Sequence, residues 1–467
     1  MSYFDADDTD WKPSPKDIAG QDTTAPADAV LADTAPDAVA DTAPDTAADD
    51  TAVGSDADTS QDGTAAPFSP DIGGGLPSEI TKIGTPTSLF DVTGIHTVKL
   101  SVDPTEWAAY MDGVDKPDGK KVYEWHPAAV EVDGVAYGEA GIHGFGNGSQ
   151  IDNPQKPNVR IKFDHYTDTN IGPEGEKAFR LKASGQDDTF LRELLAGALL
   201  REAGGNAPRM GWARLWVNGK DFGPYQLQEA VDKRYFKYAF GNNDGDKFVQ
   251  EYGCLGFDCP AKGCDGLAKA WSGDPGDTQV IVDLAKAVTA AADADLKQVL
   301  GDYFYLGELL ADYAVDALLS NIDGLASAGQ NFTAYADEKT KRLHIIATGT
   351  DLTFGGFGAW YDLQTPWGSP NAWCPTRADQ IYTRIWQVPD LKSKLLTKLR
   401  NLQCGMFHQD KLLPLIASYK AVLKPMLTSD PVAKQSPGQV EAAYGSLTSY
   451  IKKRQQTLVD LLGACPQ

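Results

Sequence analysis

Residues 321–355, NIDGLASAGQNFTAYADEKTKRLHIIATGTDLTFG, constrain the fold more than any other stretch of the chain. The residues before them, 303–322, carry apolar side chains at helical spacing, and Gly324 tolerates the left-handed backbone that ends a helix. After this point NFTAYA alternates with a period of two, EKTK forms a polar turn, and LHIIAT forms a second strand. The sequence therefore predicts a buried helix followed by a β-hairpin.

Three polar residues stand at the ends of these predicted elements. Asp323 follows the helix, Asn331 opens the hairpin and Asp351 leaves its far end. Because a hairpin folds back on itself, Asn331 and Asp351 are expected to lie near each other. Carboxylate and amide oxygens in this arrangement are what a magnesium–nucleotide site needs. The same residue types also cap helices and form turns, and the pattern alone leaves that alternative open.

Composition separates an acidic tail from an ordinary soluble domain. Residues 1–71 hold seventeen Asp and two Lys, so they carry 15 of the 23 net negative charges. Residues 1–75 are low-complexity Asp, Ala, Thr and Pro, which bury too little apolar surface to fold, and we expect a disordered tether. Such a tether could hold an exported domain on a membrane or other surface through its N-terminus, or be a solvated tail. No nucleic-acid binding and no transmembrane segment are expected, since the chain shows neither a basic bias nor a long apolar run.

The compartment is indicated by two signals that disagree. The chain starts MSYFDADDTD, without the basic start and apolar run of a signal peptide. Six cysteines without zinc-site spacing favour disulfides, and hence an extracytoplasmic or cell-surface location, over reduced cytosolic thiols. They are Cys254, Cys259, Cys264, Cys374, Cys404 and Cys465.

The part of the chain before residue 230 is rich in predicted strands. A glycine-rich turn that includes Gly146 and Asn147 precedes a strand with Lys162, so backbone amides and a lysine could meet phosphates there. Glycine turns are also common in ordinary hairpins. Glu193, on the helix that follows, could reach a strand lysine or be a solvated charge. Glu229, at a strand end before a helix, is a site residue or a charge favoured by the helix dipole.

After residue 231 helices predominate, with predicted helices at 278–300 and 303–322 and a helical segment at 376–463. The predicted fold class is therefore α+β, β-rich first and helix-rich second.

Five motifs follow one another along the chain: GIHGFGNGS at 141–149, VRIKFD at 159–164, FRLKAS…DDTFLRELLA at 179–196, RLWVNGKDFGPYQLQEAVD at 214–232, and the stretch 321–355. The order of these motifs resembles that of the spore-coat CotH family of atypical protein kinases. The resemblance implies a diverged protein-kinase-like fold over residues 90–465, with a strand-rich lobe at 90–230 and a helical lobe at 231–465. It also implies phosphorylation of Ser or Thr on exported or surface proteins, with ATP and Mg²⁺ or Mn²⁺.

Roles for individual residues also follow from the resemblance. Asp323 matches the catalytic base, and Asn331 and Asp351 match the metal ligands. Lys162 is the best match for the nucleotide lysine, with Glu193 as its helix partner. Lys156, Arg160 and Lys182 compete with Lys162 for the role of nucleotide lysine. Glu229 matches a residue near the edge of the nucleotide. Gly146 and Asn147 match the turn residues that bind the nucleotide.

Four positions depart from the family pattern. Gly349 stands where a second acidic residue is usual, and Gln330 stands where a histidine is usual. His143 and Phe145 stand where basic residues flank the glycine turn. These losses weaken metal and phosphate binding together. The alternative function is therefore a catalytically impaired kinase-like protein with a structural, binding or adhesive role at the cell surface.

Overall fold

The computed structural model describes residues 86–114, 123–146, 155–250, 257, 271–274, 278–365 and 380–466. The predicted tether, Asn147 and four of the cysteines (Cys254, Cys259, Cys264 and Cys374) lie outside these ranges.

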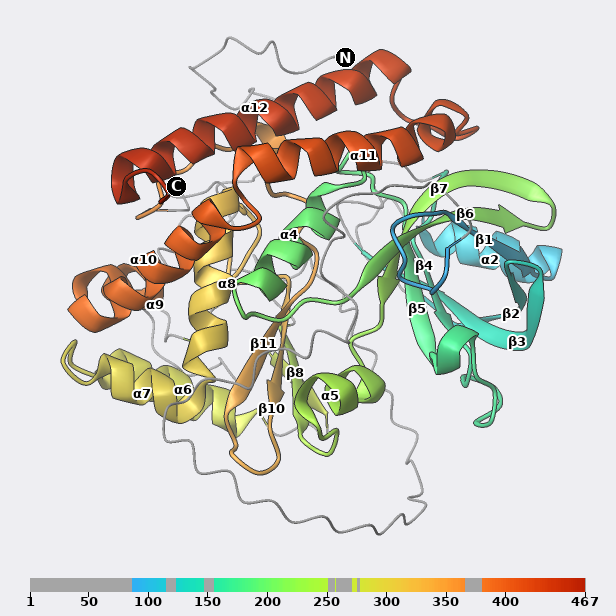
Figure 1. Ribbon diagram of the computed structural model, residues 1–467. Helices are drawn as coiled ribbons and strands as arrows, with labels where there is room; N and C mark the ends of the chain where they lie inside the picture. Colours follow the sequence, from blue (N-terminus) through green and yellow to red (C-terminus); the bar gives the residue numbers. More distant parts are fainter. Residues whose placement is uncertain are drawn as a thin grey trace, which may run out of the picture.

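Seven strands close into a barrel in the order β1-β2-β3-β4-β5-β7-β6, with β1 and β6 pairing in parallel and the other neighbours antiparallel (Figure 1). Helix α2 (Pro104–Val114) packs on β2 and β3. The strands are β1 (His96–Ser101), β2 (His126–Val132), β3 (Val135–Gly144), β4 (Val159–Lys162), β5 (Ala178–Lys182), β6 (Met210–Val217) and β7 (Lys220–Glu229).

Alternation along each barrel strand decides which residues face the interior. Ile161 on β4, Leu181 on β5 and Leu227 on β7 belong to the fully buried barrel core. Because neighbouring strand residues point to opposite faces, Arg180 and Lys182 are left on the outer face of β5. The outer face of the barrel is therefore where its charged groups meet the rest of the molecule.

Helix α4 (Arg192–Glu202) joins the barrel to the helix-rich part, and eight of its eleven residues are buried. The Asp187 carboxylate accepts a 2.8 Å hydrogen bond from the backbone N–H of Arg192, the first helical residue. This contact satisfies a backbone donor that has no partner within the helix. The helix thereby presents Glu193 in its first, buried turn.

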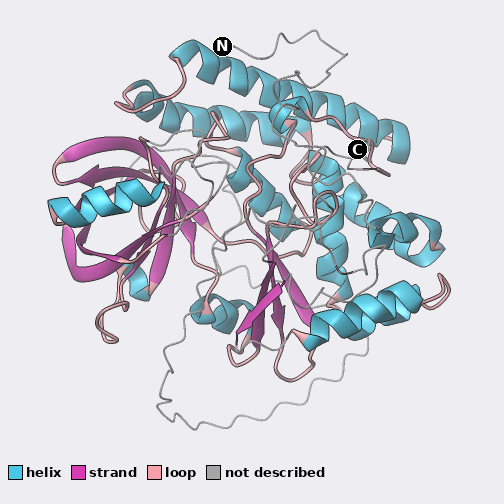
Figure 2. Cartoon of the chain, turned by 180° about the vertical axis from the view of Figure 1, so that it is seen from behind, coloured by secondary structure: helices cyan, strands magenta, loops and turns pink. Residues whose placement is uncertain are grey.

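In the second part of the chain, helices surround α8 (Leu306–Leu319) and a small sheet of order β11-β10-β8-β9 (Figure 2). Helices α11 and α12 run side by side along one edge of the molecule (Figure 1). The elements besides α8 and those two helices are α5 (Lys233–Phe240), β8 (Asp246–Gln250), β9 (Trp271–Asp274), α6 (Gln279–Ala290), α7 (Leu296–Tyr303), β10 (Phe332–Ala336), β11 (Leu343–Ala347), α9 (Gln380–Gln387) and α10 (Pro389–Cys404). The two helices themselves are α11 (Gln409–Thr428) and α12 (Pro437–Leu462).

Contacts far apart in sequence hold the two parts together. Lys156, just before β4, forms a 2.6 Å ion pair with Asp430 in the loop between α11 and α12, and both side chains are buried. Within the helical part, a disulfide between Cys404 and Cys465 ties the end of α10 to the segment after α12. The barrel is therefore fastened to the C-terminal helices on the side away from α5.

The mixed α+β class is confirmed, as are the helix and hairpin of residues 303–347. The predicted helix at 278–300 was wrong in one respect, because Ala291 takes an extended backbone and separates α6 from α7. Within the ranges described, none of the helices has the length and apolar character that crossing a membrane requires.

Candidate functional site

The helix and hairpin bring the three polar residues of the opening stretch together. Helix α8 ends at Ser320, whose φ of 50° turns the chain into the loop that carries Asp323. On the hairpin, Phe332 pairs with Ala347, and the Thr348 N–H donates to the Asn331 carbonyl at 2.8 Å. Asn331 therefore lies beside the segment that leads to Asp351, and the predicted approach of Asn331 to Asp351 itself stays a prediction.

Asp323 is held by two side-chain amides. Asn331 Nδ2 donates to the Asp323 carboxylate at 2.7 Å and to its backbone carbonyl at 2.9 Å, and the Gln330 amide donates to the other carboxylate oxygen. Burial raises the pKa of Asp323 to about 6, the two amide hydrogen bonds oppose this shift, and the charge of Asp351 adds to it. Asp323 is thus mostly ionised at neutral pH and more basic than an exposed aspartate.

A buried lysine lies between two acids on the barrel side of the site. Lys182, the last residue of β5, contacts Glu193 of α4, and its Nζ lies 3.8 Å from Asp351 Oδ1. Burial alone would lower the pKa of Lys182, but the charges of Glu193 and Asp351 outweigh it and raise the pKa. Lys182 therefore remains a cation, and it joins the barrel to the Asp351 segment.

Glu193 contacts three segments. Its Oε2 accepts from Lys182, while its Oε1 accepts from Gln228 Nε2 of β7 at 2.8 Å and from the Gly349 backbone N–H at 3.0 Å. Gly349 has a φ of +65°, and a Cβ placed on it would lie 2.9 Å from Asn331 Oδ1. Glycine is needed here both for the backbone and for the close approach of Asn331.

Of the four candidate basic residues, it is Lys182 that lies against Glu193. Lys162, on β4, pairs in register with Ala178 and Gly141, Arg160 pairs with Arg180, and Lys156 is in the ion pair with Asp430. The expected pairing of Glu193 with Lys162 is therefore corrected to Lys182. The reason is that β5, not β4, ends over α4.

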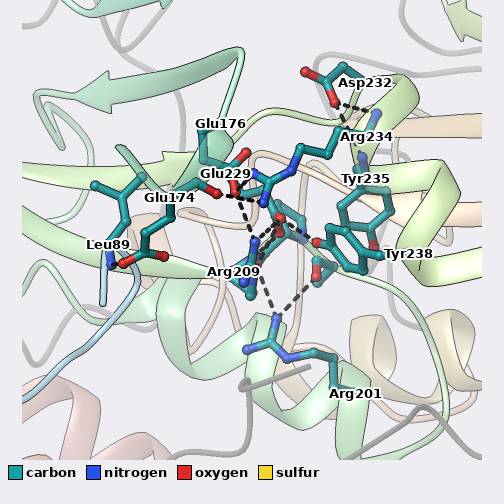
Figure 3. Close-up of polar contacts among 12 residues, drawn as sticks. Leu89, Glu174, Glu176, Arg201, Arg209, Glu229, Asp232, Arg234, Tyr235 and Tyr238 are labelled. Carbon is teal, nitrogen blue, oxygen red and sulfur yellow. Dashed lines mark hydrogen bonds and ion pairs between the residues drawn. The ribbon is translucent and has the colours of Figure 1, made fainter. Parts of the chain in front are cut away.

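Glu229 lies in a separate cluster where the chain passes from the barrel to α5 (Figure 3). Its Oε1 accepts from Arg209 Nη2 at 2.6 Å and from the Tyr238 hydroxyl, and its Oε2 accepts the Arg209 backbone N–H at 2.9 Å. Glu176 contacts both Arg209 and Arg234. With a side chain only 1% exposed, Glu229 joins β7 to its neighbours, and its position at the nucleotide's edge stays a prediction.

The glycine turn is described up to its second glycine. Gly146 has a φ of +86°, and its carbonyl accepts a 2.7 Å hydrogen bond from the Tyr123 hydroxyl. The backbone conformation is one that favours glycine. The nucleotide contacts predicted for Gly146 and Asn147 remain predictions.

Sequence reasoning missed two members of the site. Gln228 donates a hydrogen bond to Glu193, which lies 35 residues away in the sequence, and no local sequence pattern predicts this pairing. Lys182 was named only as a competitor of Lys162. Its position at the end of AFRLK, eleven residues before the first-turn Glu193, was the signal that could have identified it.

Comparison with known proteins assigns the class. The family model described as CotH kinase protein matches residues 142–458, which is more than half of the chain. The chain therefore belongs to the CotH kinase protein family, and this membership supports a kinase-like function.

Among solved structures, the chain is similar to the Helicobacter pylori proinflammatory kinase CtkA at 11% identity. That match covers 67% of this chain and 94% of CtkA, with a TM-score of 0.27. No curated protein sequence matches.

Proposed function

We propose that this protein is a kinase that transfers the terminal phosphoryl group of ATP to Ser or Thr hydroxyls of exported or surface proteins. The observation that carries the proposal is Lys182 lying between Glu193 and Asp351, on the barrel side of Asn331 and Asp323. Phosphoryl transfer depends on positioning and charge neutralisation, and a strand lysine paired with a helix glutamate is a recurring part of kinase sites.

Lys182, in place of Lys162, would neutralise phosphate oxygens of the nucleotide. Its contact with Glu193 fixes the direction of the ammonium group, since Glu193 is itself held by Gln228 and Gly349. Asp323 would accept the proton of the substrate hydroxyl. Its raised pKa, about 6, makes it a stronger base while leaving it ionised at neutral pH.

Asp351 and Asn331 fit the requirements of Mg²⁺ or Mn²⁺. Asn331 Nδ2 is engaged by Asp323, which leaves its Oδ1, on the Gly349 side, as an oxygen donor. One carboxylate and one amide suit a magnesium site in which phosphates and water provide the remaining ligands. When bound, the metal would neutralise charge on the phosphate oxygens.

The test is transfer from radiolabelled ATP to a Ser/Thr-rich protein, with Mg²⁺ or Mn²⁺. We expect transfer by the wild type and none by Asp351→Ala. Thr340→Ala, in the β10–β11 turn far from Asp351, is the matched control and should retain transfer. Equal transfer by wild type and Asp351→Ala would refute the assignment of Asp351.

A second candidate function is a binding or structural role without catalysis, favoured by Gly349. At this position the chain lacks a second carboxylate, and the space is closed by Asn331. A thermal-shift titration separates the two, because a ligand that binds the native state raises the Tm. Absence of any shift with ATP and either metal would favour the non-catalytic role.

The location we propose is extracytoplasmic or cell-surface, with the acidic tail as a tether. The support is the Cys404–Cys465 disulfide, since disulfides persist in oxidising compartments. Fractionation of cells that produce the full-length protein, followed by thiol labelling, would test the location and the oxidation state together.

A further inference from the structure

The outer face of the barrel carries a row of basic side chains in register. His143 on β3 pairs with Arg160 on β4, Arg160 pairs with Arg180 on β5, and Arg180 pairs with Gln228 on β7. Residues directly opposite each other in a ladder point to the same face of the sheet. The row therefore ends at Gln228, which already belongs to the candidate site.

The row lies to one side of the phosphate-binding groups. Lys182 is on the same face of β5 as Arg180, two residues or about 7 Å further along the strand. Lys182 contacts Glu193 and approaches Asp351, whereas the other direction along β5 leads toward Phe179, which pairs with Glu229 where the chain leaves the barrel. A nucleotide with its phosphates at Lys182 and Asp351 would thus place its nucleoside end against Arg180 and Arg160.

Arg160 also lies toward α5. Burial raises the pKa of Asp232, the N-cap residue of α5, and the charges of Lys247 and Arg160 oppose that shift. Arg160 is therefore close enough to the start of α5 to act on Asp232. Arg180 therefore lies within electrostatic reach of Lys182, and Arg160, its neighbour on β4, lies within reach of the start of α5.

Both guanidinium groups lie over aromatic rings. The Arg180 guanidinium carbon is 5.2 Å from the centre of the Phe145 ring in the glycine turn, and that of Arg160 is 5.5 Å from the Trp125 ring. Both arginines are partly exposed, and none of the carboxylates in the described ranges forms an ion pair with Arg180. A guanidinium is planar, cationic and weakly hydrated, so it stacks readily on a second flat ring.

We propose that Arg180, with Arg160 beside it, forms a planar cationic platform on which the base of the nucleotide stacks. This inference rests on the proposed nucleotide-binding function and assigns the base-binding part of the same site. Arg180 would contribute affinity through the flat face of its guanidinium rather than through a phosphate contact. A stacked guanidinium would contribute on the order of tenfold in affinity.

The experiment separates the two halves of the ligand. We would measure the binding of ATP, AMP and inorganic tripolyphosphate, each with Mg²⁺, to the full chain and to Arg180→Lys and Arg180→Gln. Lysine retains the positive charge of arginine but lacks its planar guanidinium group, and glutamine lacks both the charge and the guanidinium group. Both variants should therefore lose about tenfold in affinity for ATP and for AMP. Both should bind tripolyphosphate as the wild type does.

Lys177→Gln is the matched control. Lys177 directly precedes β5, is half exposed and pairs with Asp164 at 3.1 Å, so this substitution removes the same charge away from the row. It should leave all three affinities unchanged. The Tm of each variant without ligand, compared with that of the wild type, separates loss of folding from loss of binding.

Three outcomes would refute the proposal that the base of the nucleotide stacks on Arg180. Full ATP affinity in Arg180→Lys would show that charge alone is needed, and reduced tripolyphosphate affinity in Arg180→Gln would show a phosphate contact. Unchanged ATP affinity in both variants would remove Arg180 from the site. A wild type that binds none of the three ligands would refute the proposed function itself, which distinguishes that failure from the other three.

Discussion

The backbone N–H of Gly349 donates a 3.0 Å hydrogen bond to the Glu193 carboxylate, 156 residues earlier in the chain. The same carboxylate contacts Lys182. Helix α4, strand β5 and the segment that leads to Asp351 therefore meet at one acidic side chain. A substitution at Glu193 would therefore remove a contact to both of the other segments.

Replacing Gly349 with Ala is expected to destabilise the protein more than replacing Gly219. Both glycines have a positive φ, +65° and +77°, but a Cβ at Gly349 lies 2.9 Å from Asn331 Oδ1 while one at Gly219 meets no atom within 4 Å. Each change should cost about 1–2 kcal/mol for the left-handed backbone. Gly349→Ala should lose more through crowding. Urea denaturation of the two variants checks this, and equal losses would contradict the close approach of Asn331.

Replacing Lys182 with Met should strongly destabilise the fold and abolish nucleotide binding. The substitution leaves Glu193 buried without its cation, a change that typically costs about 3–5 kcal/mol. Lys162→Met, on the neighbouring strand, is the control and should leave ATP binding intact. The double variant Lys182→Met/Glu193→Gln should be more stable than Lys182→Met alone, because it removes the unpaired charge. Loss of ATP binding in Lys162→Met with retention in Lys182→Met would reverse the assignment of the nucleotide lysine.

The rate of phosphoryl transfer should rise with pH and level off above about 6, the pKa of Asp323. Only the ionised carboxylate can accept the proton of the substrate hydroxyl. A rate profile that is flat between pH 5 and pH 7 would contradict its role as base.

The stability of the fold should respond to Asp323 in the opposite direction. Its pKa in the folded protein is raised above the ordinary 3.8, so the unfolded state releases the proton first as pH rises. Relative to Asp323→Asn, the wild type should lose stability between about pH 4 and pH 6 and change no further above that range. Denaturation curves of both proteins across this range provide the measurement.

Removing the Cys404–Cys465 disulfide should lower stability substantially. The bridged residues are 61 apart, and closing a loop of that length in the unfolded chain corresponds to about 4 kcal/mol. The double variant Cys404→Ser/Cys465→Ser, compared with wild type in urea under non-reducing conditions, tests this. Equal unfolding midpoints would show that the cross-link constrains the unfolded chain very little.

Local sequence patterns predicted the part of the candidate site that lies within one continuous segment of the chain. The helix, turn and hairpin of residues 303–351 follow from apolar spacing, and the approach of Asn331 to the Asp351 segment follows from hairpin geometry. Lys162 and Lys182 could not be separated in this way. Both are on the outer face of the barrel, and only the position of α4 under the end of β5 decides which one meets Glu193.

The role of Glu229 could not be decided from local sequence patterns either. At the end of a strand and before a helix, it matched both a site residue and a charge favoured by the helix dipole. Its actual partner, Arg209, precedes it by 20 residues and reaches it only because β6 and β7 are neighbours in the closed barrel. Sequence patterns report on the conformation of a segment, whereas this pairing depends on how the barrel closes.

The Lys156–Asp430 ion pair has a mechanical consequence for the site. It fastens the barrel to the loop between α11 and α12, while the contacts of Arg234 with Glu176 and of Tyr238 with Glu229 fasten the barrel to α5 at the other end. Two separate attachments resist the rotation that a single hinge would permit. Lys182 and Asp351 are therefore brought into register when the chain folds, so the entropy of aligning them is lost at that stage and not when a ligand arrives.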